Sequence, residues 1–139
     1  MAENGSTPTS LEVLEERRRL LVARDMDGFA DLFAEHGVIE MPFASDAFPG
    51  RLDGRETIRT FSARARDLPV EIIDLRTRQV HQTADPEVVI IELDTVGRVT
   101  ATGEGFEVPC IQVFRIRDGK ILLFRDYADV QSIPDLTTD

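Results

Sequence analysis

The stretch Phe106–Val130, FEVPCIQVFRIRDGKILLFRDYADV, decides the fold because it contains two long alternating segments separated by Asp118-Gly119. Alternation of apolar and polar side chains with a period of two is typical of strands that bury one face. The stretch therefore predicts a β-hairpin with strands at about 105–117 and 120–130. On the second strand, Asp126 follows Leu122 and Phe124 onto the apolar face.

The length of the turn decides which residues of the two strands lie opposite one another. A two-residue turn would pair Arg117 with Lys120 and bring Arg115 onto the buried face. A three-residue loop, with Gly119 in the left-handed conformation of a bulge, keeps both arginines outward. We therefore expect the three-residue loop. The cross-strand pairs that it predicts are Phe114 with Leu122, Gln112 with Phe124, and Cys110 with Asp126.

Two helices are expected before any strand. Thr9 and Glu12 form a capping-box pattern, so we expect a first helix that runs to about Arg24. We place Arg17 among the charged residues on its outer face. Asp27 is expected to cap a short second helix. The residues that we expect on the inner face of the first helix are Leu11, Leu14, Leu21 and Val22.

The middle of the chain predicts a strand, a loop, a third helix and two more strands. Val38–Phe43 is expected to form the first strand, and Pro49 and Gly50 place residues 44–52 in a loop. Asp53 with Glu56 is expected to start the third helix, which Pro69 ends. The two strands that precede the hairpin are expected at about 71–81 and 87–99.

Length and composition limit the domain organisation and the partners. The chain has 139 residues and a formal net charge of −10, so we expect one domain at 10–131 between tails at 1–9 and 132–139. The negative charge argues against nucleic acid and anionic membrane surfaces as partners. No apolar run is long enough to span a membrane, and the polar start resembles no secretory signal, so we expect a cytoplasmic protein. The single Cys110 cannot form an internal disulfide, and we expect no metal and no cofactor.

Asp126 has two interpretations that the residues alone leave open. It can be a structural carboxylate, either paired with an arginine from a helix or turned to solvent by a bulge after Phe124. Alternatively, it lines a cavity between the sheet and the helices, where loss of water raises its pKa and suits it to proton transfer. Gln112 lies nearby on the same face, where it can orient a substrate or hold a water.

Three stretches resemble the SnoaL-like branch of the nuclear transport factor 2-like superfamily: residues 32–43, 52–58 and 117–127, which read LFAEHGVIEMPF, LDGRETI and RDGKILLFRDY. That branch includes polyketide cyclases, limonene-epoxide hydrolase, ketosteroid isomerase and the PhzA/B proteins. The resemblance implies an α+β fold, in which a cone-shaped, curved, mixed or antiparallel sheet wraps round three N-terminal helices.

The resemblance carries over to some residues and not to others. Asp126 matches the essential aspartate of limonene-epoxide hydrolase, whose arginine has no counterpart in Glu92–Thr95. Asp94 is a candidate second acid, but strand alternation places it on the exposed face. The positions of the three ketosteroid isomerase residues hold Met41, Gln112 and Arg19, so none of those roles is kept.

These observations lead to one functional expectation and one alternative. We expect a small-molecule enzyme in which Asp126 performs isomerisation, cyclisation or water addition on a hydrophobic metabolite, such as a polyketide or terpenoid of secondary metabolism. The pocket residues that we expect are Met41, Phe43, Cys110, Gln112 and Phe124. The alternative is a non-catalytic ligand-binding or assembly module with the same fold. The resemblance also implies a homodimer through the outer sheet face, where Tyr127, Ile111 and Val113 lie.

Overall fold

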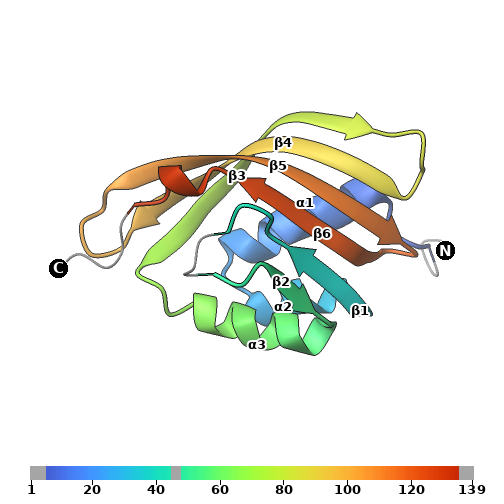
Figure 1. Ribbon diagram of the computed structural model, residues 1–139, viewed down its shortest axis with the longest axis horizontal. Helices are drawn as coiled ribbons and strands as arrows, with labels where there is room; N and C mark the ends of the chain where they lie inside the picture. The colour runs from blue at the N-terminus through green and yellow to red at the C-terminus, as the bar shows by residue number, and fades with distance from the viewer. Residues whose placement is uncertain (1–5, 45–47, 135–139) are drawn as a thin grey trace.

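The computed structural model describes residues 6–44 and 48–134, and Figure 1 shows a long curved sheet with helices behind and below it. The helices are α1 (Ser10–Val22), α2 (Met26–Asp31), α3 (Arg55–Ala65) and a single 3₁₀ turn, η1 (Val130–Ser132). The strands are β1 (Phe33–Glu40), β2 (Arg51–Asp53), β3 (Val70–Gln82), β4 (Val88–Val99), β5 (Gly105–Arg117) and β6 (Lys120–Ala128). None of the described helices has the length and apolar character that crossing a membrane requires.

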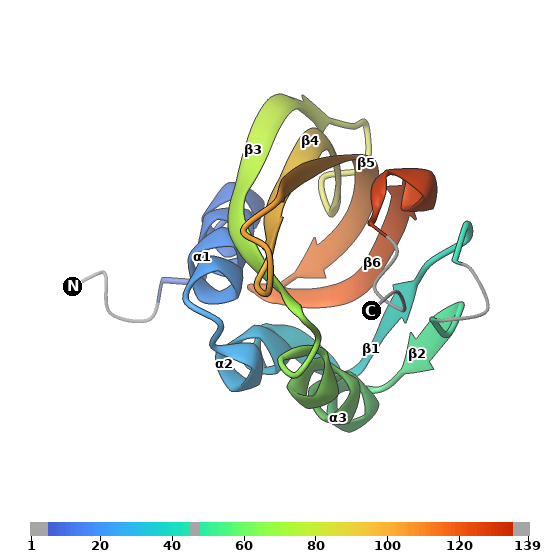
Figure 2. The same cartoon turned by 90° about the vertical axis from the view of Figure 1, so that its left-hand side faces the viewer.

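The six strands form one mixed sheet in the order β2-β1-β6-β5-β4-β3. The pairing of β1 with β6 is parallel, and all the others are antiparallel. Figure 2 shows the sheet curling so that α1 lies beside β3, while α2 and α3 lie beneath the curved strands. We call the face that packs on the helices the inner face. The expected α+β class, with three helices and a curved mixed sheet, is confirmed.

The first strand differs from its prediction. β1 is Phe33–Glu40, which starts five residues earlier than expected and ends before Pro42. The end of the segment expected to be a loop, 44–52, instead belongs to β2, which runs to Asp53 and pairs with β1. Two backbone hydrogen bonds frame this pair, from the Met41 amide to the Gly50 carbonyl and from the Gly54 amide to the Gly37 carbonyl. A three-residue strand is too short to show an alternating pattern in the sequence.

The caps of the helices agree with the prediction in one case out of three. Thr9 and Glu12 form the expected capping box at α1. The Asp25 side chain, rather than that of Asp27, caps α2 by accepting a hydrogen bond from an amide of its first turn. The N-cap of α3 is Gly54, at φ +95°, and no side chain caps this helix. A positive φ of this kind favours glycine, so Gly54 rather than Asp53 is the residue at which the helix begins.

The β5–β6 register corrects the expected three-residue loop. Arg117 pairs with Lys120 across a two-residue turn, in which Asp118 and Gly119 both have positive φ. Primed two-residue turns of this kind match the twist of the strands that they join. The register then shifts by one residue at Leu122, so both arginines still point outward. The cross-strand pairs that result are Phe114 with Phe124, Gln112 with Asp126, and Cys110 with Ala128.

The core lies between the inner face of the sheet and the helices, and its composition corrects the prediction for α1. Leu11 and Val22, expected to be buried, are exposed. Arg17, expected on the outer face, is 2% exposed and lies in the core. The apolar side chains of α1 in the core are Val13, Leu14 and Leu20.

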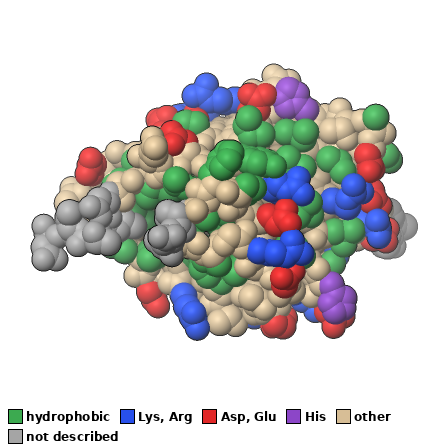
Figure 3. Space-filling model, viewed as in Figure 1, with side chains coloured by type: hydrophobic (Ala, Val, Ile, Leu, Met, Phe, Trp, Pro, Cys, Tyr) green, Lys and Arg blue, Asp and Glu red, His purple; other side chains and the backbone are tan. Residues whose placement is uncertain are grey.

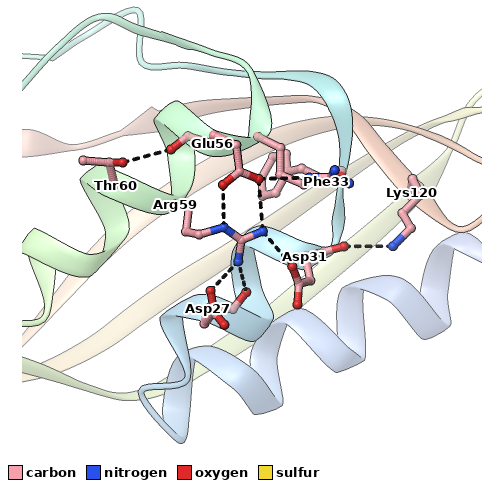
Figure 4. A network of polar contacts seen from close by, with 8 residues as sticks. Asp27, Asp31, Phe33, Glu56, Arg59, Thr60 and Lys120 are labelled. Atoms are coloured by element: carbon pink, nitrogen blue, oxygen red, sulfur yellow. Dashed lines mark hydrogen bonds and ion pairs between the residues drawn. The ribbon is translucent and has the colours of Figure 1, made fainter.

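An arginine network joins the two short helices under the sheet (Figure 4). Arg59 of α3 donates to Asp31 at 2.8 Å and to Glu56 at 2.9 Å, and it also pairs with Asp27 of α2. Lys120 of β6 donates to the Asp31 carbonyl at 2.9 Å. A network of several charges orders its elements better than an isolated surface pair does. It therefore connects α3 to α2, and α2 to the start of β6, beneath the sheet.

Candidate functional site

Asp126 lies on the inner face of β6, partly buried, beside Phe124. Within residues 6–44 and 48–134, its carboxylate makes one hydrogen bond, which Gln112 Nε2 donates to Oδ1 at 3.2 Å. Burial raises the pKa of Asp126 above its usual range. The hydrogen bond from Gln112 and the positive charge of Arg17 lower that pKa by less. The site thus holds a carboxylate that is partly shielded from water and lacks a direct ion-pair partner in the described part of the chain.

Arg17 of α1 lies behind Gln112. Its Nη1 donates to Gln112 Oε1 at 2.5 Å, and its guanidinium carbon lies 4.9 Å from the Phe114 ring centre and 5.8 Å from that of Phe124. Burial lowers the pKa of Arg17 to about 10, so the side chain remains a cation at neutral pH. The three polar groups form a chain from α1 through β5 to β6, with Asp126 at its end.

Two apolar cavities adjoin Asp126. The larger, of about 270 Å³, lies between the sheet and all three helices, and the smaller, of about 180 Å³, lies toward η1. Asp126 and Met41 line both, so a ligand in either cavity can contact the carboxylate. The apolar residues that line the larger cavity include Phe29, Ile39, Phe61, Leu68, Ile72 and Phe124, and its charged lining residues besides Asp126 are Arg24, Arg66 and Glu71. Other residues that line the smaller one are Phe43, Phe48, Ala128, Val130 and Ile133.

The expected pocket residues divide into two groups. Met41 and Phe124 line the larger cavity together with Asp126, and Phe43 lines the smaller one. Phe43 is nevertheless 61% exposed and packs edge-on against Tyr127, with ring centres 5.5 Å apart. Gln112 and Cys110 are buried on the inner face but line neither inner cavity. Burial raises the pKa of the Cys110 thiol to about 11, so the thiol is neutral at physiological pH.

Asp94 lines neither of these cavities. It lies on the outer face, as the alternation predicted, but it is 1% exposed because Arg78 covers it. Arg78 donates to its carboxylate at 2.8 Å through Nε and contacts it at 2.6 Å through Nη2. The hollow that Asp94 and Arg78 line, of about 600 Å³, is on the outer face of the sheet. Asp94 and Asp126 therefore do not share a cavity.

Arg17 is the site residue that the sequence reasoning missed, and a signal for it was present. Positions 13, 14, 17, 20 and 21 stand at i, i+1, i+4, i+7 and i+8, which all lie on one face of a helix. Arg17 occupies the middle of that otherwise apolar stripe. Reading the stripe from Val13 rather than from Leu11 places the arginine in the core.

The described residues offer no evident metal site, since no three His, Cys, Asp or Glu side chains among them gather closely enough to hold an ion. A single carboxylate in largely apolar surroundings, such as Asp126, is suited to proton transfer.

The raised pKa of Asp126 makes a prediction for stability. A carboxylate whose folded-state pKa is raised keeps its proton to higher pH in the native state than in the unfolded chain. Stability therefore falls as pH rises above the unfolded value of about 3.9. We expect Asp126→Asn to raise the melting temperature at pH 7–8 and to change it little near pH 3, as thermal unfolding across this range can measure. The exposed control Asp53→Asn should give no such rise, and an unchanged or lower value for Asp126→Asn at pH 8 would contradict the expectation.

Comparison with known proteins gives consistent matches. A family model described as SnoaL-like domain matches residues 14–124. An uncharacterised PhzA/B-like protein of Pseudomonas aeruginosa is 39% identical over 120 residues, which are 84% of this chain and 81% of that protein. The crystal structure of a candidate isomerase from Bacillus subtilis is 28% identical, with a TM-score of 0.80, and the match covers 89% of this chain and 88% of that one.

Two further solved structures are similar in fold. An LEH-like epoxide hydrolase of Mycobacterium tuberculosis is 21% identical, with a TM-score of 0.65 over 87% of this chain and 83% of that one. Another Mycobacterium tuberculosis protein, solved in complex with estradiol-17β-hemisuccinate, is 20% identical, with a TM-score of 0.73 over 91% of this chain and 98% of that one. At these identities the likeness shows the fold alone. The fold is thus one that small-molecule enzymes and a steroid-binding protein share.

Proposed function

Since the chain belongs to the SnoaL-like domain family, we propose that it is a small-molecule enzyme in which Asp126 transfers a proton inside an apolar cavity. One observation carries the proposal: Asp126 is partly shielded from water, lines both inner cavities and makes only one hydrogen bond within residues 6–44 and 48–134, from a neutral amide. Keeping a carboxylate in this environment costs free energy of folding. Carboxyl groups with a perturbed pKa in cavities are typical of acid/base sites.

The geometry supports a reaction that needs one carboxylate. Asp126 takes a proton from an acidic position of the bound substrate and returns it to another atom, which completes an isomerisation or assists a ring closure. The apolar walls exclude water that would otherwise compete for the proton. Water addition by a pair of acids is less well supported, because Asp94 is on the outer face and is engaged by Arg78.

The cavities also indicate the kind of substrate. Their volumes of about 270 and 180 Å³ lie near or below the lower end of the roughly 300–1,000 Å³ usual for ligand pockets. Their walls are largely Phe, Ile, Leu and Met side chains. A compact hydrophobic metabolite, such as a polyketide- or terpenoid-like carbonyl compound, fits both properties.

Proton transfer can be tested before the substrate is known. A panel of small hydrophobic ketones and lactones is incubated with the protein in D₂O, and deuterium incorporation next to the carbonyl is followed by NMR. We expect faster exchange for at least one member of the panel with wild-type protein and none above background with Asp126→Asn. Compounds that bind without any exchange, in both proteins alike, would favour the non-catalytic binding module.

We also propose that a second copy of the chain covers the outer sheet face. Figure 3 shows hydrophobic side chains gathered on this face with charged ones around them. Ile111 is 48% exposed there, beside the outer hollow that Phe43 and Tyr127 help to line. The same hollow contains Arg78 and Glu92, so one patch offers both signs of charge, as a contact between identical surfaces requires.

The proposed contact predicts the effect of one substitution. Ile111→Glu places a charge at the centre of the patch, so we expect a dimer of the wild-type protein to become a monomer by sedimentation velocity at the same concentration. Leu11→Glu is the control, because Leu11 is exposed to a similar degree, 44%, but lies on α1. A wild-type protein that remains monomeric at tens of micromolar would exclude a stable dimer.

A further inference from the structure

The buried cation at Arg17 has a role that packing does not explain. We propose that Arg17 is a positioning residue, which holds the Gln112 amide in the one orientation that keeps Asp126 ionised and ready to accept the first proton. The inference rests on the proposed function, because it concerns the same carboxylate. It also predicts the order of the two proton transfers: Asp126 acts first as a base and then as an acid.

The charge of Arg17 is costly where it lies. The side chain is 2% exposed, and removing a cation from water costs several kcal/mol unless other groups compensate. The compensation within the described chain comes from the nearby charge of Asp126, one hydrogen bond to Gln112 and the faces of Phe114 and Phe124. The Arg17 Nε has no hydrogen-bond partner there. A leucine or methionine would complete the apolar stripe of α1 without these costs, which points to a use for the charge.

Arg17 determines which way the Gln112 amide points. A guanidinium carries only donors, so it can bind only the carbonyl oxygen of the amide, Oε1. The amide nitrogen, Nε2, must then face Asp126. An N–H group stabilises a carboxylate and cannot accept a hydrogen bond from a protonated acid. In the flipped orientation, Oε1 would instead accept from protonated Asp126, so Arg17 selects the ionised form.

The other titratable groups near Asp126 do not provide this selection. Arg24, Arg66 and Glu71 line the larger cavity with it, but they are not among the groups that shift its pKa. Cys110 of β5 lies on the same inner face, and burial keeps its thiol neutral by raising its pKa to about 11. Burial of Asp126 itself raises the pKa of that carboxyl, which favours the neutral form. The charge of Arg17 and the amide of Gln112 are the two influences that act in the opposite direction. These two groups stabilise the ionised form, while burial leaves the carboxylate more basic than an ordinary aspartate.

A base-first carboxylate limits the class of reaction. Asp126 removes a proton from a carbon next to a carbonyl, the C–H bond breaks, and its electron pair remains on the substrate as an enolate. Asp126, now protonated, returns the proton to another carbon of the conjugated system, and the double bond moves. Atoms and charge balance without a co-reactant. Reactions that begin with protonation of the substrate, such as acid-assisted epoxide opening, fit this arrangement less well.

The test measures protonation directly and needs no substrate. The carboxyl carbon of Asp126 and the side-chain amide of Gln112 are titrated by NMR in the wild-type protein, where we expect both signals to follow one midpoint. Arg17→Met should raise the pKa of Asp126 further, by about one unit or more. Arg17→Lys, which keeps the charge, should bring the pKa of Asp126 back more than half of the way to its wild-type value. Arg18→Met is the matched control, because it removes an exposed cation from the same helix and should leave the midpoint unchanged.

The outcomes separate this inference from the proposed function. An Asp126 midpoint that is the same in folded Arg17→Met as in wild-type protein would overturn the positioning role. If Arg17→Met does not fold, the wild-type titration decides alone. A Gln112 amide signal that stays constant while Asp126 titrates would then overturn the positioning role. Failure to find deuterium exchange in the D₂O panel would contradict the proposed enzymatic function. It would not affect the titrations, which test the role of Arg17 separately. With an active substrate, the acidic limb of the kcat/KM profile should move to higher pH in Arg17→Met.

Discussion

Asp126→Asn is expected to lower kcat by about 10²–10⁴-fold, the range that loss of a general acid/base group usually produces. The change removes the titrating group and keeps the shape of the side chain. Gln112 Nε2, which now donates to Oδ1 of Asp126, can donate equally to the amide oxygen of an asparagine. Ligand dissociation constants should therefore change by less than about threefold, and the loss should fall on kcat rather than on KM.

Asp94→Asn is the informative control for that experiment. It makes the same chemical change in the carboxylate that Arg78 covers on the outer face. We expect kcat to stay within about twofold of wild type, since Asp94 lines neither inner cavity. A loss in Asp94→Asn as large as that in Asp126→Asn would mean that two carboxylates act together. Equal turnover by wild-type protein and Asp126→Asn would remove Asp126 from the chemistry.

The inward position of Asp126 was predictable because alternation over a long strand is a strong signal. The same argument placed Phe124 and Asp126 on the correct face from an incorrect turn. The structure has a two-residue turn and a separate bulge at Leu122, so Ile121 rather than Leu122 is buried before the bulge. A bulge shifts the alternation by one residue wherever it occurs, so side-chain faces alone cannot locate it. Backbone conformation at Asp118 and Gly119 supplies the missing information.

The rest of the candidate site depends on contacts between distant residues. Arg17 and Gln112 are 95 residues apart, and no local pattern connects them. The larger cavity likewise draws its wall from all three helices and four strands, so its volume depends on tertiary packing. Charged residues on a helix are usually exposed, and the prediction put Arg17 on the outer face for that reason. Its position in the apolar stripe indicated the buried face instead.

Phe114→Ala is the second prediction with a large effect, and it concerns the stability of the site. Phe114 is 0% exposed, stacks on Phe124 with ring centres 4.7 Å apart and an interplanar angle of 8°, and lies under Arg17. Truncation of a buried phenylalanine to alanine usually costs about 3–5 kcal/mol, because apolar contacts are lost and a cavity remains. Here it also removes the aromatic face that offsets the burial of a cation.

Urea unfolding measures that loss as a lower midpoint with an unchanged slope. Phe43→Ala is the matched control: its ring is 61% exposed, so the same truncation should cost less than about 1 kcal/mol. Phe114→Leu should recover part of the stability, since it fills much of the volume but offers no ring to Arg17. If Phe114→Leu restored all of it, the guanidinium would need no aromatic support, and packing alone would hold Arg17 beside Gln112. A loss below about 1.5 kcal/mol for Phe114→Ala would instead show that the surrounding core collapses into the space, and the ring stack would then contribute little to the site.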